Sequence, residues 1–157
     1  MTVNNPLSTI SVPVPFHQVR AEHVESAIDA LIAQSQARLD AIGSAPRTYE
    51  ASLGALDLAT SELDFAMNVA SHLEAIDGTP EMRAAYSQIL PKVSAFASKI
   101  MLSEPLYRAL RELSQTDAAK SLDPARARFL KKTLADFRRN GAELDEKGKA
   151  RLAEIDV

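Results

Sequence analysis

Three histidines, His17, His23 and His72, are the residues of this sequence best suited by type to bind a metal ion. A catalytic zinc ion usually has three protein ligands on rigid elements. No histidine is followed by another four residues later, so the helical zinc motif His-Glu-x-x-His is absent. Glu25 and Glu74 follow His23 and His72 by two residues, which on a helix is a different face. We therefore expect these histidines to form structural hydrogen bonds at helix ends or between helices.

The sequence also lacks the residues and motifs that nucleophilic catalysis requires. The sequence has no cysteine, which excludes a disulfide framework and thiolate chemistry, and it has no Gly-x-Ser-x-Gly motif. Ser71 directly precedes His72, but adjacent side chains on a helix diverge. The five glycines are isolated, so no phosphate-binding loop is present. We expect no catalytic, cofactor-binding or metal-binding residue in this chain, which by itself should not be an enzyme.

A cluster of positive charge stands out near the C-terminus. On a helix over residues 123–140, the cations would lie on one side and the large apolar residues on the other: Arg128, Lys131, Lys132, Arg138 and Arg139 against Leu130, Leu134 and Phe137. Such a face can bind nucleic acid, anionic lipid or an acidic partner. We favour the outer face of a helical bundle, because the rest of the chain is acidic and no aromatic residue is interleaved among the cations.

The elements that position these residues are predicted to be helices. Apolar residues recur at helical spacing, and successive segments open near residues 21, 48, 79, 103, 123 and 145, with N-terminal caps expected from Thr48, Thr79, Ser103 and Asp123. Gly141 should end the helix over residues 123–140 in a left-handed cap. With 157 residues, 46% hydrophobic, we predict one all-α domain, a layered bundle of five to six helices. Pro6, Pro13 and Pro15 predict that residues 1–19 form an extended arm packed on the helical domain, residues 20–157.

Two details of the bundle can be predicted. The second helix, from Thr48 to about Asp77, has two apolar stripes and should be buried on both sides at the centre. The stripes are Leu53, Leu56, Leu63, Met67 and Ala70, and Leu58, Phe65, Val69 and Ile76. In the third helix, Pro91 should cause a kink without ending the helix.

The net charge and the hydropathy of the sequence limit the classes of partner that this chain could bind. The formal net charge of −3 favours neither nucleic acid nor a membrane surface, and no run of about 18 apolar residues could span a bilayer. The first residues, Met1 to Pro6, lack the basic and apolar regions of a secretory signal. We expect a cytoplasmic protein that binds neither nucleic acid nor membrane.

Six short patches recur in a fixed order along the chain. They are Asn5-Pro6-Leu7; Phe16 with Glu22-His23-Val24; Thr48-Tyr49-Glu50; Ser71-His72-Leu73; Leu90-Pro91; and Asp136-Phe137-Arg138 followed by Gly141. Together they resemble the N-terminal helical lobe of the thimet oligopeptidase family of zinc metallopeptidases, over about residues 5–155. Tyr49 stands where many members of that family have tryptophan. Oligopeptidase A-like, neurolysin-like and dipeptidyl carboxypeptidase-like specificities all stay open.

The resemblance implies a function for the parent polypeptide. In that family this lobe forms one wall of a channel that admits short peptides, and a zinc ion in the catalytic lobe polarises a water and the peptide carbonyl. The catalytic lobe and short peptide substrates would be the partners of this chain, and zinc is expected only in the missing lobe. The resemblance adds a third option for the cations of residues 123–140, in which part of that face meets acidic surface on the missing lobe. Because the residues resembling Arg151 and Ile155 lie early in a longer helix, the chain looks truncated inside its last helix.

A stand-alone helical interaction module is the alternative. It would dock a partner helix in a groove and would have no enzymatic activity. The two hypotheses differ in whether the reading frame continues past Val157 to a His-Glu-x-x-His segment.

Overall fold

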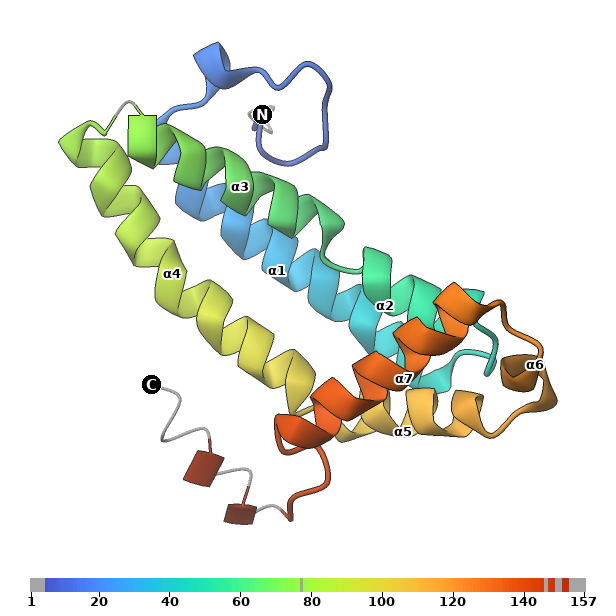
Figure 1. The fold of residues 1–157 in the computed structure, drawn as a ribbon. Coiled ribbons are helices and arrows are strands. Elements are labelled where there is room, and N and C mark those ends of the chain that lie inside the picture. The colour runs from blue at the N-terminus through green and yellow to red at the C-terminus, as the bar shows by residue number, and fades with distance from the viewer. Residues whose placement is uncertain (1–4, 77, 146, 149–150, 153–157) are drawn as a thin grey trace. The chain divides into compact units, whose positions relative to one another are not determined.

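A computed structural model describes residues 5–76, 78–145, 147–148 and 151–152. Its chain forms two compact units, each described here by itself. Unit 1 comprises Met1–Ala37 and Ala59–Ala95, and unit 2 comprises Arg38–Leu58 and Phe96–Val157. Within the described residues all regular structure is helical and no strand is present, which confirms the all-α multi-helix bundle (Figure 1).

Unit 1 is built around the first part of α1 (Ala21–Ser44), α3 (Ser61–Ile76) and the first part of α4 (Pro80–Met101). Their inward faces supply its core: Val24, Ala27, Ile28, Leu31, Leu63, Ala66, Val69, Ala70, Met82 and Ile89. On the surface, Lys92 Nζ of α4 bridges Asp29 at 2.7 Å and Glu25 at 2.8 Å, both on α1. The hydrogen bond to Asp29, and next the one to Glu25, raises the pKa of Lys92. Together the two bonds connect α4 to α1.

Unit 2 contains the end of α1, a π-helical turn η2 (Glu50–Gly54), α2 (Ala55–Leu58), the end of α4, α5 (Glu104–Ser114), α6 (Asp117–Lys120) and α7 (Pro124–Arg139). Figure 1 shows α5 joined to α7 through the short α6. Helix α5 packs against both α7 and η2. The core of unit 2 contains Leu39, Ile42, Leu53, Phe96, Leu106, Tyr107, Leu110, Leu113, Leu130, Leu134 and Phe137.

The caps explain where most helices begin. The side chains of Thr48, Thr79 and Asp123 accept backbone N–H groups, as the sequence predicted, and Asp123 accepts two. Ser103 precedes α5 but makes no side-chain cap hydrogen bond, so that predicted cap is wrong. Thr116 caps α6, a single turn that the sequence analysis missed because four residues carry no periodicity.

The second predicted helix is interrupted, which corrects the sequence interpretation. It opens with a π-turn, in which Gly54 N–H donates to the Tyr49 carbonyl at 2.8 Å, and α2 ends at Leu58. Helix α3 then restarts after Thr60, whose carbonyl accepts from Asp64 N–H at 2.8 Å and whose hydroxyl donates to the Asp64 carboxylate at 2.9 Å.

The interruption also changes burial. Leu58 is 65% exposed and Ile76 is 72% exposed, so the predicted burial of the second stripe is wrong at both of its ends. The break between α2, which ends at Leu58, and α3, which begins at Ser61, interrupts the 3.6-residue period, so apolar residues on either side of it cease to follow one stripe. Leu58 therefore leaves the face that its spacing from Phe65 predicted, whereas Ile76 is exposed in the last turn of α3.

Three further expectations have mixed outcomes. Helix α4 continues through Pro91, as predicted, and the kink stays a prediction. The extended arm is not confirmed: of residues 5–19, Leu7 is fully buried, but Phe16–Gln18 form a 3-10 turn. The arm's boundary at residue 19 stays a prediction. Most of the expected last helix, including its predicted truncation near Ile155, lies outside the described residues.

Replacing Leu53 by alanine should lower the free energy of unfolding by about 2–5 kcal/mol, because its side chain is fully buried and the change leaves a cavity. Leu58→Ala, five residues away and 65% exposed, is the matched control and should change it by less than about 0.5 kcal/mol. Urea denaturation of both variants measures the difference. Equal destabilisation by the two changes would contradict the burial described for this segment.

Candidate functional site

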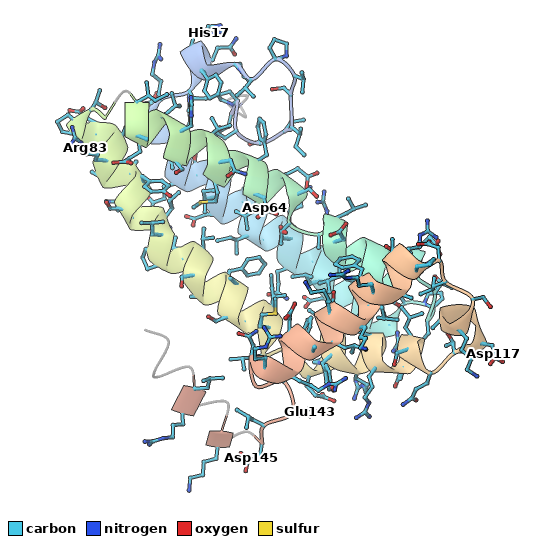
Figure 2. All side chains as sticks on the ribbon, viewed as in Figure 1. His17, Asp64, Arg83, Asp117, Glu143 and Asp145 are labelled. Carbon is cyan, nitrogen blue, oxygen red and sulfur yellow. The ribbon has the colours of Figure 1, made fainter. Side chains whose placement is uncertain are left out.

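The three histidines lie in unit 1 and make separate local contacts. His17 lies in the exposed turn η1 (Phe16–Gln18), with its Nε2 3.2 Å from Gln18 Nε2 (Figure 2). His72 is exposed on α3, and its ring centroid lies 5.1 Å from that of Phe16. The imidazole rings of His17 and His72 thus each contact a residue of the turn η1.

His23 lies at the start of α1 and completes a cap. Its Nδ1 accepts the backbone N–H of Arg20 at 3.1 Å, which fixes Nδ1 as an acceptor, and its carbonyl accepts from Asn5 Nδ2 at 2.8 Å. This is the helix-end hydrogen bond that the sequence predicted for a structural histidine. Among the described residues, no group of three or more His, Cys, Asp or Glu side chains could hold a metal ion.

Helix α7 has the two opposite faces that its sequence predicted. Leu130, Leu134 and Phe137 are 5%, 6% and 1% exposed, and they face the core of unit 2. The five cations opposite them are all exposed: Arg128, Lys131, Lys132, Arg138 and Arg139. We call these five residues the basic face of α7. Burial of the apolar side orients the helix and so presents the basic face to solvent.

The C-terminal end of α7 is closed by the Asp-Phe-Arg…Gly patch. Gly141 has φ +90°, its N–H donates to the Arg138 carbonyl at 3.1 Å, and Ala142 N–H donates to the Phe137 carbonyl at 3.0 Å. This is the left-handed glycine cap expected from the sequence. The patch therefore has a structural role: Phe137 anchors the helix in the core, and Gly141 ends it.

Tyr107 of α5 ties the segment after α7 to the core. Its hydroxyl donates to Oε1 of Glu143, which Figure 2 labels, at 2.5 Å, and its ring stacks on Phe137 with centroids 6.2 Å apart. Burial, and next the hydrogen bond to Glu143, raises the pKa of Tyr107, while Arg138 acts in the opposite direction. A phenol held protonated in this way is a structural donor at neutral pH.

Arg47 clamps the end of α1 within unit 2. Its guanidinium donates to the carbonyls of Gly43 at 3.0 Å and Ala45 at 2.6 Å, and to Glu112 Oε2 of α5 at 2.6 Å. The hydrogen bond from Arg47 holds the pKa of Glu112 below its ordinary value. The sequence analysis missed this pair, because 65 residues separate its members and no local pattern connects them.

Arg126 shows how a cation of α7 behaves when it has partners. It stacks over the Tyr49 ring at 4.6 Å and lies 3.5 Å from Glu50 of η2 and 3.4 Å from Asp123. This joins the start of α7 to η2. Within the part of the chain that the structure describes, Arg128, Lys131 and Lys132 have no such ion pair. These three cations of the basic face are thus not neutralised by any carboxylate of the described residues.

Comparison with known proteins gives a family match. The model of the neurolysin/thimet oligopeptidase N-terminal domain matches residues 28–149. Oligopeptidase A of Salmonella typhimurium is 30% identical over 98% of this chain and 23% of its own length. Two Arabidopsis thaliana proteins also match. A probable cytosolic oligopeptidase A is 28% identical over 84% of this chain and 19% of its own length. An organellar (chloroplastic/mitochondrial) oligopeptidase A is 27% identical over 90% of this chain and 18% of its own length.

The chain thus spans less than a quarter of the length of these relatives. In the described part of the chain, no helix is long and apolar enough to cross a membrane.

Gly141→Ala should destabilise the protein by about 1–2 kcal/mol, because an L-residue is strained at φ +90°. Gly43→Ala is the matched control: Gly43 lies inside α1, and the nearest atom to an added Cβ is 3.7 Å away. That change should be neutral or should stabilise by about 0.5–1 kcal/mol. Thermal and urea unfolding of both variants measure the effect, and an unchanged Gly141→Ala protein would contradict the cap.

The Arg47–Glu112 pair should stabilise the fold in a pH-dependent way. Since the pKa of folded Glu112 is lowered, its contribution is present above its unfolded pKa, near 4.5, and is lost as the pH falls through the lower folded value. Glu112→Gln should therefore lower the stability more at pH 7 than near pH 3. Urea unfolding at both pH values measures this, with Arg47→Gln/Glu112→Gln to test that the two changes are not additive. The same loss at both pH values would refute the ionic contribution.

Proposed function

The chain belongs to the neurolysin/thimet oligopeptidase N-terminal domain family, and from this membership we propose that it is the non-catalytic N-terminal lobe of an oligopeptidase. The observation that carries the proposal is the extent of the match. The family model covers residues 28–149, while relatives named oligopeptidase A align with nearly the whole chain over only 23% of their own length. A lobe of a larger peptidase accounts for both facts.

The proposed role of this lobe is steric. It would form one wall of a channel that admits short, unfolded peptides and excludes folded proteins. The anchors within each unit support a rigid wall: Lys92 joins α1 and α4 in unit 1, and Arg47 and Tyr107 fasten loop segments in unit 2. Selection by a rigid surface needs shape and rigidity, and it needs no reactive group on the wall itself.

The peptide-cleaving centre is proposed to lie in the polypeptide outside this chain, with zinc as its metal. When bound there, zinc would polarise a water and the peptide carbonyl. The described residues of this chain do not fit that ion, because their histidines lie apart and His23 Nδ1 already accepts a backbone hydrogen bond. No step of the reaction is therefore assigned to a residue of this lobe.

We place the parent protein in the cytoplasm as a further part of the proposal. One relative is named a probable cytosolic oligopeptidase A, and this supports the placement; another is named organellar. Cell fractionation with an antibody to this domain tests it, and recovery in an organelle would refute it.

The full-length polypeptide that carries this chain should hydrolyse short fluorogenic peptides and should leave folded proteins intact. Strong chelators should abolish the activity and zinc should restore it, because the proposed centre depends on the metal. Residues 1–157 expressed alone are the matched control and should have only background activity.

Two results would count against the proposal. A full-length polypeptide that hydrolyses no peptide under any metal condition would refute the peptidase assignment. A reading frame that stops at Val157 would favour the alternative, a stand-alone helical interaction module.

A further inference from the structure

The basic face of α7 is a long row of exposed charge. Its first and last members, Arg128 and Arg139, lie three turns apart on a helix of 16 residues, roughly 24 Å long. All five members are exposed, and no aromatic residue belongs to the row. The face is therefore suited to carboxylates and poorly suited to stacking on nucleic acid bases.

The fold itself supplies almost no counter-charge for this face. Arg139 pairs with Asp136 at 3.3 Å on the same helix. Other cations of the domain reach carboxylates on a different element, as Arg47 reaches Glu112 and Lys92 reaches Asp29. Within the described ranges no such cross-element pair reaches Lys131 or Lys132.

Positive and negative charges are also distributed unevenly between α7 and the rest of the sequence. Helix α7 holds six of the 18 cationic residues and one of the 21 acids, so it carries +5 while the remainder of the chain carries −8. The chain is thus rich in carboxylates, but those described reach only Arg126 and Arg139 of α7, and none of them pairs with Arg128, Lys131 or Lys132. A net negative chain would also be repelled by an anionic membrane or by nucleic acid at longer range.

We propose that the basic face of α7 docks a carboxylate-rich surface of the polypeptide that follows this domain. The proposal rests on the proposed function, since it requires the chain to be one lobe of a longer protein. It assigns α7 as the docking helix and acidic side chains as its partner.

The length of the relatives favours the following part of the same polypeptide, over a separate molecule, as the partner of the basic face. The chain matches an N-terminal domain and 23% of the length of oligopeptidase A, so the remainder of such a protein follows α7. Helix α7 ends at Arg139, ten residues before the end of the family match, and a covalently tethered lobe is held at a higher effective concentration than a separate partner. Exposed ion pairs are individually weak, but several in a row on a tethered partner set its register.

Zero-length carbodiimide coupling of lysine amines to carboxylates tests the proposal directly. It is applied to the full-length polypeptide and followed by peptide mass spectrometry. Lys131 and Lys132 should couple to Asp or Glu residues beyond position 157. Lys92 with Asp29, at 2.7 Å, and Lys120 with Asp117, also at 2.7 Å, are the internal positive controls for coupling within the domain. The yield of the inter-lobe product should fall severalfold between about 0.05 M and 1 M salt.

Matched charge variants give a second readout. Lys131→Gln/Lys132→Gln should speed proteolytic cleavage of the segment after α7 severalfold in the full-length protein, because the following lobe is held less firmly. Lys99→Gln/Lys120→Gln removes the same charge from exposed positions on α4 and α6, and it should leave the cleavage rate unchanged.

Several outcomes would overturn the proposal. Coupling of Lys131 and Lys132 only within residues 1–157 would exclude the downstream partner. Coupling between isotopically distinct copies would assign the face to self-association, and coupling only to an added acidic peptide would assign it to substrate. Peptide hydrolysis is measured on the same samples, so an active protein without the inter-lobe product refutes this inference alone, and an inactive protein refutes the proposed function.

Discussion

Burial of the apolar face of each helix is the constraint on which the rest of this structure depends. The chain has no cysteine, and its described residues contain no strand and no metal-binding group, so helix packing must supply most of the stability. In unit 2, Leu110 and Leu113 of α5 and Phe137 of α7 are at most 1% exposed. Once Phe137 and its neighbours are buried, helical geometry places the cations of α7 on the opposite side.

The polar contacts act on the ends of elements that this packing has already brought together. Arg47 closes the end of α1, and Tyr107 holds the segment after α7 through Glu143. Lys92 plays the corresponding role in unit 1, where it joins α4 to two carboxylates of α1. Perturbed pKa values here have structural causes, namely burial and ion pairing, and they do not mark a reaction centre.

As the proposed lobe of a peptidase, this domain would contribute through its surfaces. Its histidines form caps and ring contacts, and among the described residues Arg128, Lys131 and Lys132 of the basic face of α7 have no ion-pair partner. The two proposed roles, as a wall of a peptide channel and as a docking surface, require different properties of the same domain. The first needs rigid helices, and the second needs charges that folding leaves unpaired.

The sequence by itself determined the helical class, the caps at Thr48, Thr79 and Asp123, the glycine cap at Gly141 and the two faces of α7. These depend on interactions within about one or two turns of helix, which spacing and residue type encode. Only the tertiary structure decided the π-turn and break before α3, the exposure of Leu58, and the pairing of Arg47 with Glu112. These depend on which segments far apart in the chain pack together, because that packing sets which carbonyls and carboxylates lie within reach and no local pattern records it.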